Sequence, residues 1–154
     1  MMQPDWHETV KGIYFEIFEQ LAFMFGEELD KNDVQSPDDE FIKATMTFSG
    51  HRSGGMDIIV PKRLAPSLAY NILGIDESDP MDAGIAEDAL RELLNTLCGR
   101  TLPALFTDVE VFDLHPPEIE AISHKKWQQM LDHQNSIAFV IEDSPILINI
   151  HFLT

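Results

Sequence analysis

Asp88-Ala-Leu-Arg-Glu92-Leu-Leu-Asn95-Thr-Leu-Cys-Gly99 is the stretch that decides both the fold and the candidate functional site. At about 100° per residue, a helix would gather its carboxylates, its carboxamide and its glycine into an arc of roughly 60°, with Arg91 at the rim. The residues on this arc are Asp88, Glu92, Asn95 and Gly99. The leucines at positions 90, 93, 94 and 97 would point the opposite way, into a core. Glycine inside a helix costs up to about 1 kcal/mol relative to alanine, so Gly99 raises the question of what approaches there so closely.

The hydrophobic pattern divides the rest of the chain into helices and hairpins. We expect helices over 5–25, 61–73, 82–103 and 123–132, with Gly26 stopping the first and Pro103 ending or kinking the third. We expect strands over 41–48, 56–60, 109–114, 137–142 and 146–152. The glycine-rich segment 49–55 would close a first hairpin, and 143–145 a second at the C-terminus. Loops are expected over 27–39, 74–80 and 115–118.

The order of these elements repeats along the chain. Glu19-Gln-Leu-Ala22-Phe-Met-Phe-Gly26 aligns without gaps with residues 92–99, and hairpin material follows each helix. We therefore expect a single domain over 1–154 with two related halves, about 1–78 and 79–154. Its fold class would be α/β of the α+β type, an antiparallel sheet with two long related helices packed on one face. Ala22 stands where the second copy has Asn95, so only the second helix retains the amide.

The composition argues against several classes of function. The chain has 154 residues, 44% of them hydrophobic, and a formal net charge of −17. Such acidity disfavours nucleic acid and anionic membranes as partners, and no apolar run reaches the roughly 20 residues of a membrane span. The first residues lack the pattern of a signal peptide, and the lone Cys98 has no partner for an internal disulfide. We therefore expect a cytoplasmic protein.

Other chemical motifs are missing from the sequence. The six histidines, at positions 7, 51, 115, 124, 133 and 151, do not have the spacing of a helical zinc site. The chain has no Gly-x-Ser-x-Gly turn for a hydrolase triad, and Ser53-Gly54-Gly55 lacks the lysine and spacing of a phosphate loop. We therefore expect no metal site and no cofactor of the protein's own.

Asp88, Glu92 and Asn95 carry a resemblance to a known family. The chain resembles the CheC/CheX/FliY family of chemotaxis phosphatases, most of all its CheX branch. The family motif is an Asp or Ser, a Glu four residues on, an Asn three further, and a proline about two dozen residues later. Pro117 follows Asn95 with 21 residues between them, and the adjacent Pro116 leaves the register of that proline open. The duplicated order of helix and strands also agrees with the family.

The resemblance implies a phosphatase that acts on a phosphorylated response regulator of the CheY type. Such a regulator carries an acyl phosphate on an aspartate, with Mg²⁺ in its own pocket. By resemblance, Asn95 would position the attacking water and Glu92 would engage the regulator's lysine. The residues that would bind or support are Asp88, Arg91, Gly99 and Pro117. Ala22 implies one site here, where other members of the family have two.

Other interpretations stay open. The polar arc could be an ordinary solvated helix face. The domain could be a non-enzymatic scaffold that docks a response regulator or a flagellar or signalling component. A sensor of a small ligand is a third possibility, for which the sequence shows no cradle. The intact Glu92 and Asn95 pair favours the enzyme, since a pure scaffold could lose it.

Three further features point to possible interfaces. Phe23 falls toward the polar side of the first helix and could serve a contact, and Lys62-Arg63 could be a local docking point or an ordinary solvated pair. The C-terminal hairpin is hydrophobic on both sides near its end, in residues 146–153. An edge strand of that kind needs cover, which favours a homodimer joined by sheet edges.

Overall fold

A seven-stranded antiparallel sheet forms the centre of the protein in a computed structural model, which describes residues 6–36, 38–50, 52–106 and 112–153. The strands lie in the order β1-β6-β7-β3-β2-β4, and β5 also pairs with β2. The strands are β1 (Gly26–Glu28), β2 (Glu40–Gly50), β3 (Ser53–Pro61), β4 (Phe112–Leu114), β5 (Glu118–Ser123), β6 (Ser136–Ile141) and β7 (Ser144–Leu153). The helices are α1 (Trp6–Ala22), α2 (Ala65–Leu73), α3 (Ala83–Leu105) and α4 (His124–Leu131). Two short 3₁₀ helices, Lys31–Asp33 and Lys62–Leu64, complete the described elements.

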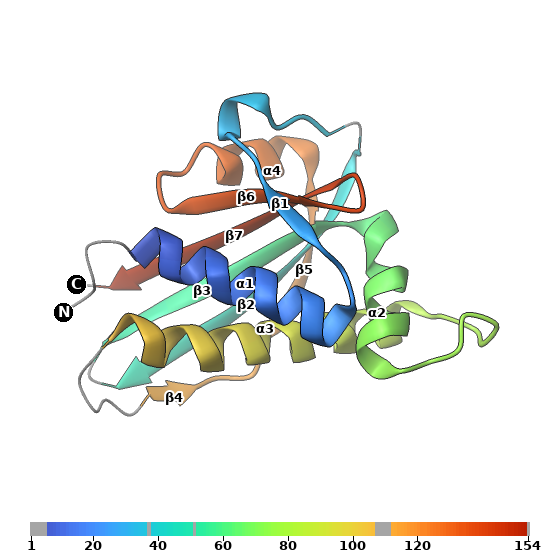
Figure 1. Cartoon of the computed structure of the whole chain (residues 1–154), viewed down its shortest axis with the longest axis horizontal. Helices are drawn as coiled ribbons and strands as arrows, with labels where there is room; N and C mark the ends of the chain where they lie inside the picture. Colours follow the sequence, from blue (N-terminus) through green and yellow to red (C-terminus); the bar gives the residue numbers. More distant parts are fainter. Residues whose placement is uncertain (1–5, 37, 51, 107–111, 154) are drawn as a thin grey trace.

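The two faces of the sheet are covered by different helices (Figure 1). Because side chains alternate along a strand, Ile58 and Ile148 face α1 and α3, whereas Ile59 and Leu147 face α4. Trp127 of α4 is fully buried and stacks on Phe41, with ring centroids 5.1 Å apart. The larger core thus lies between the sheet and the two long helices, which confirms the expected α+β architecture.

The topology repeats one order of elements twice. A long helix precedes a short strand and then a hairpin, first as α1, β1 and β2–β3, then as α3, β5 and β6–β7; the second set also contains β4 before β5 and α4 after it. The two hairpins meet at the centre of the sheet, where β3 pairs with β7 and Ile58 lies opposite Ile148. The short strand of each set pairs with the hairpin of the other, β1 with β6 and β5 with β2. This exchange ties the two sets into one sheet.

The first helix ends earlier than the sequence predicts. It stops at Ala22 rather than at Phe25, and Phe23, rather than Gly26, adopts a left-handed φ of 54°. The N–H of Met24 donates to the carbonyl of Phe18 at 3.1 Å and closes this end of the helix. Gly26 instead begins β1, where a Cβ would lie 3.0 Å from the Phe15 ring. The glycine therefore serves a close approach of strand and helix.

Several other boundaries differ from the expectation. The sequence predicts neither β1 nor β5, and it places a turn at 49–55 where Ser53, Gly54 and Gly55 already belong to β3. Helix α3 does not end at Pro103 but continues to Leu105. The proline thus lies two residues before the end of the helix. The helix expected from Pro61 begins with a 3₁₀ turn. Of the strand expected over 109–114, the structure has Phe112–Leu114, and residues 109–111 lie outside the described residues.

The C-terminal strand is not at an edge of the sheet, contrary to the expectation. β7 lies between β3 and β6, and its apolar residues are buried on both faces. One set packs under α1 and α3 and the other under α4, which explains why the segment is hydrophobic on both sides. The argument for a homodimer from an exposed C-terminal edge strand therefore does not hold.

Candidate functional site

Helix α3 presents the candidate site on its solvent side. The helix begins at Asp82, whose carboxylate accepts a hydrogen bond from the N–H of Ile85 at 2.9 Å, a standard N-terminal cap. Its leucines at positions 90, 93, 94 and 97 are buried against the sheet and the neighbouring helices, as the periodicity predicts. The opposite side carries the exposed residues Asp88, Glu92, Asn95 and Gly99. One rigid helix thus holds all four in a fixed order.

The four positions differ in how they are held. Asp88 is paired with Arg91, whose Nη1 lies 2.9 Å from its Oδ1, and Glu87 lies 3.7 Å from the same guanidinium. By contrast, the side chains of Glu92 and Asn95 make no hydrogen bond or ion pair with any residue that the structure describes. The carboxylate of Glu92 and the amide of Asn95 are therefore available to a partner molecule.

Gly99 is not needed for packing within the chain. A Cβ built at this position meets no atom within 4 Å outside the helix's own neighbouring backbone, and the residue is exposed. Gly99 therefore does not serve tight packing between helices of this chain. The space beside Gly99, above the polar face of α3, is not filled by the described residues.

Pro117 lies on a different layer from the other predicted site residues. It is half-buried in the connection between β4 and β5. Helix α3 contacts both β2 and β5, so the fold brings Pro117 to the edge of the sheet that α3 covers. Pro117 is thus on a different element from Glu92 and Asn95.

The corresponding part of α1 does not form a second site. Glu19 is exposed, as Glu92 is, but Ala22 is completely buried at the last position of the helix. The side-chain amide of Asn71 in α2 donates to the carbonyl of Ala22 at 2.7 Å. The end of α1 is thus packed against α2, whereas the corresponding turn of α3 presents Asn95 to solvent.

Cys98 lies beneath the polar face of α3. It is completely buried. Burial raises the pKa of its thiol to about 12. A thiol of this kind is a small apolar core group and no nucleophile.

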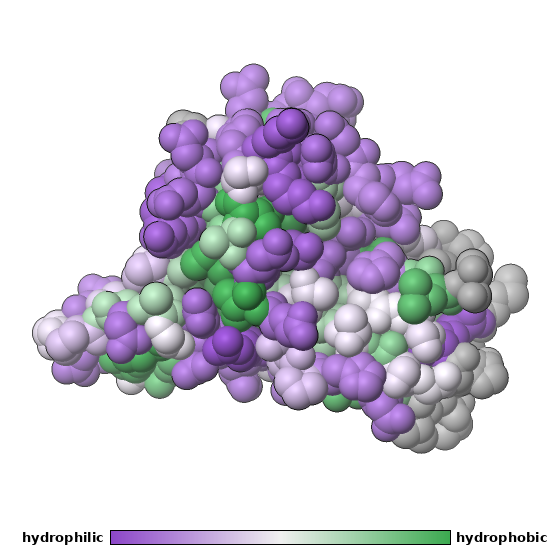
Figure 2. Space-filling model, turned by 180° about the vertical axis from the view of Figure 1, so that it is seen from behind, coloured by the Kyte–Doolittle hydropathy of each residue, from purple (hydrophilic) through white to green (hydrophobic). Residues whose placement is uncertain are grey.

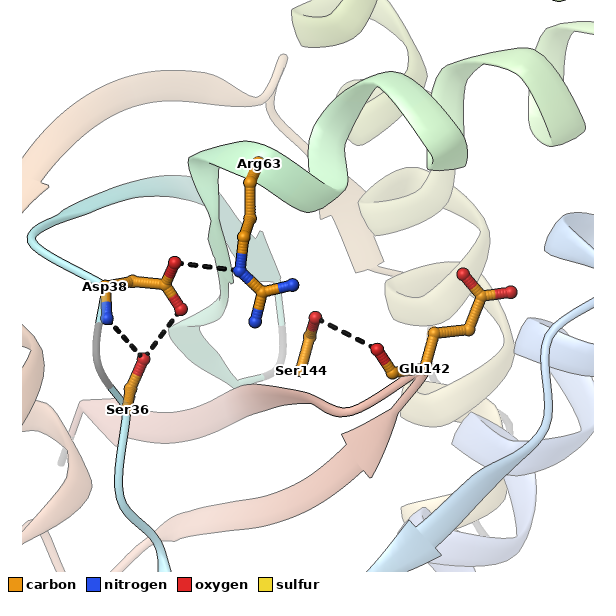
Figure 3. A network of polar contacts seen from close by, with 5 residues as sticks. All are labelled: Ser36, Asp38, Arg63, Glu142 and Ser144. Atoms are coloured by element: carbon orange, nitrogen blue, oxygen red, sulfur yellow. Dashed lines mark hydrogen bonds and ion pairs between the residues drawn. The ribbon is translucent and has the colours of Figure 1, made fainter.

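The basic pair at 62–63 is engaged within the chain. The Nε of Arg63 donates to Asp38 at 2.8 Å, and the hydroxyl of Ser36 donates to the same carboxylate at 2.8 Å (Figure 3). Lys62 lies 3.8 Å from the carboxylate of Glu40. Arg63 therefore fastens the segment before β2 to the 3₁₀ turn Lys62–Leu64, and both cations of the pair have an acidic partner within the chain.

A groove of about 610 Å³ opens beside β5 and the start of α3. Its apolar lining includes Ile42, Ile119 and Ala86, and the carboxylates of Asp82 and Glu87 line it as well. On the side of the molecule away from α1, Figure 2 shows this region as apolar surface enclosed by hydrophilic residues. The volume falls in the range of small-molecule sites, and no sequence motif indicates this groove. Glu92 and Asn95 lie outside this groove.

Two negative findings concern the described residues alone. They contain no group of three or more histidine, cysteine or carboxylate side chains placed to hold a metal ion. None of their helices is long and apolar enough to cross a membrane.

Comparison with known proteins identifies the family. The family model described as "Chemotaxis phosphatase CheX" matches residues 42–141, which include all of α3. The chain belongs to the CheX family. None of the curated proteins matches its sequence.

Solved CheX structures share the fold over nearly the whole chain. CheX from Desulfovibrio desulfuricans has a TM-score of 0.70 at 16% identity, covering 97% of this chain and 99% of its own. CheX from Vibrio vulnificus has a TM-score of 0.72 at 16% identity, covering 97% of each chain. The CheX–CheY–BeF₃–Mg²⁺ complex from Borrelia burgdorferi matches with a TM-score of 0.63 at 14% identity, covering 99% of this chain and 100% of that one.

Proposed function

We propose that this CheX-family protein hydrolyses the aspartyl phosphate of a CheY-type response regulator, with Asn95 and Glu92 as the working residues. One observation carries the proposal. Glu92 and Asn95 are both exposed on one face of α3, and their side chains make no hydrogen bond or ion pair with the described residues. The family match, and the complex of a CheX with CheY from Borrelia burgdorferi, support the choice of partner.

The chemistry of a carboxamide suits the task proposed for Asn95. The amide oxygen accepts a hydrogen bond from a water while the NH₂ donates elsewhere, and the neutral group does not repel phosphoryl oxygens. Hydrolysis of an acyl phosphate depends mainly on the position of the water and on neutralisation of charge. Asn95 would hold the water in line with the phosphorus. The Mg²⁺ in the regulator's own pocket would supply the neutralisation, and this chain would contribute no metal.

Glu92 would fix the docked pose. Residues three apart on a helix lie on the same face, about 5–6 Å apart at their Cβ atoms. The carboxylate of Glu92 would pair with a lysine of the regulator while Asn95 reaches the phosphate. Asp88 is already paired with Arg91, so this turn would support the site rather than reach the phosphoryl group.

The deciding experiment follows the decay of a phosphorylated CheY-type regulator with and without the protein. We expect acceleration by the wild type and no acceleration by Asn95→Ala. Gln129→Ala is the matched control, because Gln129 is an exposed carboxamide on α4, across the sheet from the site. Equal activity of Asn95→Ala and the wild type would refute the assignment. Binding to the regulator without any acceleration of decay would favour the scaffold alternative instead.

We also propose that the protein works in the cytoplasm as a homodimer. The location follows from the proposed substrate and from the lone, buried Cys98. Because β7 is central, the dimer would have to form at another strand. We propose β5, because it pairs only with β2 among the described strands. Sedimentation velocity over a range of concentrations tests this, and a monomer at all of them would contradict it.

A further inference from the structure

Two phenylalanines stand in solvent at the end of α1. The side chains of Ala22 and Met24 are buried, whereas Phe23 and Phe25 between and after them are 70% and 73% exposed. They are the most exposed large apolar residues that the structure describes. Leu73, at the end of α2, is also exposed. Large apolar side chains exposed together in this way are typical of contact surfaces.

The backbone holds Phe23 in a conformation that bulky residues avoid. Its φ of 54° is left-handed, which costs a non-glycine residue free energy that surrounding contacts must offset. Three contacts do so. The Met24 N–H bonds to Phe18, the Asn71 amide bonds to the carbonyl of Ala22, and the side chains of Ala22 and Met24 are buried. The segment is therefore fixed with both aromatic rings turned outward, and strain retained in this way is common at functional sites.

The two rings lie on the same side of the contact between Glu16 and Arg100 as the candidate catalytic turn. Helices α1 and α3 run antiparallel on the same face of the sheet (Figure 1), and Arg100 lies 3.2 Å from Glu16 where they meet. Seven residues along α1 from Glu16 lead to Phe23, and seven back along α3 from Arg100 lead to Leu93, an advance of about 10 Å in the same direction. Leu93 stands between Glu92 and Asn95 in the sequence. The exposed rings therefore lie beyond this contact in the direction of the polar face of α3.

We propose that Phe23 and Phe25, with Leu73 beside them, form an aromatic ridge that docks the receiver domain of the regulator while Asn95 reaches its phosphate. This inference rests on the proposed function. Helices α1 and α3 are neighbours over the same core, so a molecule seated on Glu92 and Asn95 would be placed to reach the aromatic ridge too. Glu19 and Glu27, both exposed, flank the two phenylalanines. The complementary patch on the receiver domain would then be apolar with basic side chains at its border.

An aromatic ridge of this kind would supply binding and leave the chemistry to α3. Aromatic side chains dominate the binding energy of protein interfaces because each removes a large apolar area from water. Loss of such an anchor raises KM and leaves kcat unchanged, whereas loss of the water-positioning amide lowers kcat. The two roles are therefore separable by kinetics.

The test uses the double variant Phe23→Asn/Phe25→Ser, in which asparagine suits the left-handed backbone at position 23. Leu153→Ser is the matched control, because Leu153 is 67% exposed at the end of β7, on a different element. For the double variant we expect KM for the phosphorylated regulator to rise on the order of tenfold with kcat within about twofold. Leu153→Ser should match the wild type. Unchanged KM in the double variant overturns the proposal.

Binding separates this inference from the proposed function. The dissociation constant for the regulator carrying beryllofluoride, a phosphoryl mimic, is measured by titration calorimetry for the same variants. If the wild type binds without accelerating decay, the proposed function fails, and weaker binding of the double variant still supports the aromatic ridge. If the double variant loses self-association but binds the regulator as the wild type does, the aromatic ridge serves a second copy of this chain and the proposal is overturned. Absence of any binding by the wild type overturns it as well.

Discussion

Ala22 and Asn95 stand at corresponding positions of α1 and α3, yet Ala22 is completely buried and Asn95 is exposed. The difference arises because α1 ends at Ala22, whose carbonyl is bound by Asn71, whereas α3 continues for ten residues beyond Asn95. The two helices resemble each other in sequence but present different environments at this position. An amide introduced at position 22 alone would therefore not create a second site on α1.

Ala22→Asn should destabilise the protein and add no phosphatase activity. The larger polar side chain would enter a filled core without a hydrogen-bond partner, which costs about 1–3 kcal/mol. Thermal unfolding measures the loss, and decay of the phosphorylated regulator measures activity. Asn95→Ala, at the exposed counterpart, should leave stability within about 0.5 kcal/mol. A gain of activity in Ala22→Asn at unchanged stability would contradict the structure.

The sequence predicts the long elements well because burial imposes a period on them. The leucine spacing of α3 and the alternation in residues 137–142 report directly which side faces the core. β1 has only three residues, and its place depends on pairing with Val140, far along the chain. β5 has six residues and no clear alternation, because Ile119 and Ile122 lie on opposite faces of the sheet among carboxylates, and two prolines precede the strand.

The sequence likewise predicts only part of the candidate site and its surroundings. Exposure of Glu92 and Asn95 follows from helical period alone. The left-handed Phe23, by contrast, depends on contacts of α1 with α2, and the pairing of Arg63 with Asp38 joins two segments separated by β2 and β3. Features that depend on distant segments do not appear in a local pattern, which is why the sequence indicates the exposure of Phe23 but neither its left-handed turn nor the groove.

Cys98 should be inert to thiol reagents in the folded protein. A thiol with a pKa of about 12 is ionised on the order of one part in ten thousand at pH 8, and the side chain is inaccessible as well. We expect no labelling by a disulfide reagent over hours at pH 8 and complete labelling in concentrated guanidinium chloride. Rapid labelling of the native protein would mean that α3 opens locally around the candidate site.

The tether between Asp38 and Arg63 should make stability fall in acid. Burial acts to raise the pKa of Asp38, but hydrogen bonds from Arg63 and Ser36 outweigh it and hold the pKa below its ordinary value of 3.8. Because the folded pKa is depressed, the stabilisation is complete above the unfolded pKa and is lost as pH falls through the folded one. Arg63→Gln should therefore lower stability at pH 7 by less than about 1 kcal/mol, since the guanidinium is half exposed.

Denaturant unfolding between pH 7 and pH 3 measures this effect. The difference between the wild type and Arg63→Gln should shrink as pH falls below about 4. Lys62→Gln is the matched control, because Lys62 and Glu40 are both exposed and 3.8 Å apart, and it should leave the profile unchanged. Parallel profiles for the wild type and Arg63→Gln would show that the tether does not set the pH dependence.

Gly99→Ala should make the protein more stable and less active. Alanine in an exposed helix interior is favoured over glycine by about 0.5–1 kcal/mol, and the added Cβ meets nothing within 4 Å. The methyl group would nevertheless stand on the face that a docked regulator must cover, one turn beyond Asn95. Since a small displacement of the reacting groups is costly, we expect kcat/KM for the phosphorylated regulator to fall on the order of tenfold.

Gly12→Ala distinguishes this effect from a general consequence of a stiffer helix. Gly12 is an exposed glycine inside α1, and a Cβ there also meets nothing within 4 Å. Both substitutions should raise the midpoint of thermal unfolding by similar amounts, but only Gly99→Ala should reduce activity. If the two variants gain stability and keep full activity alike, no partner backbone approaches α3 at Gly99, and the glycine has no part in docking.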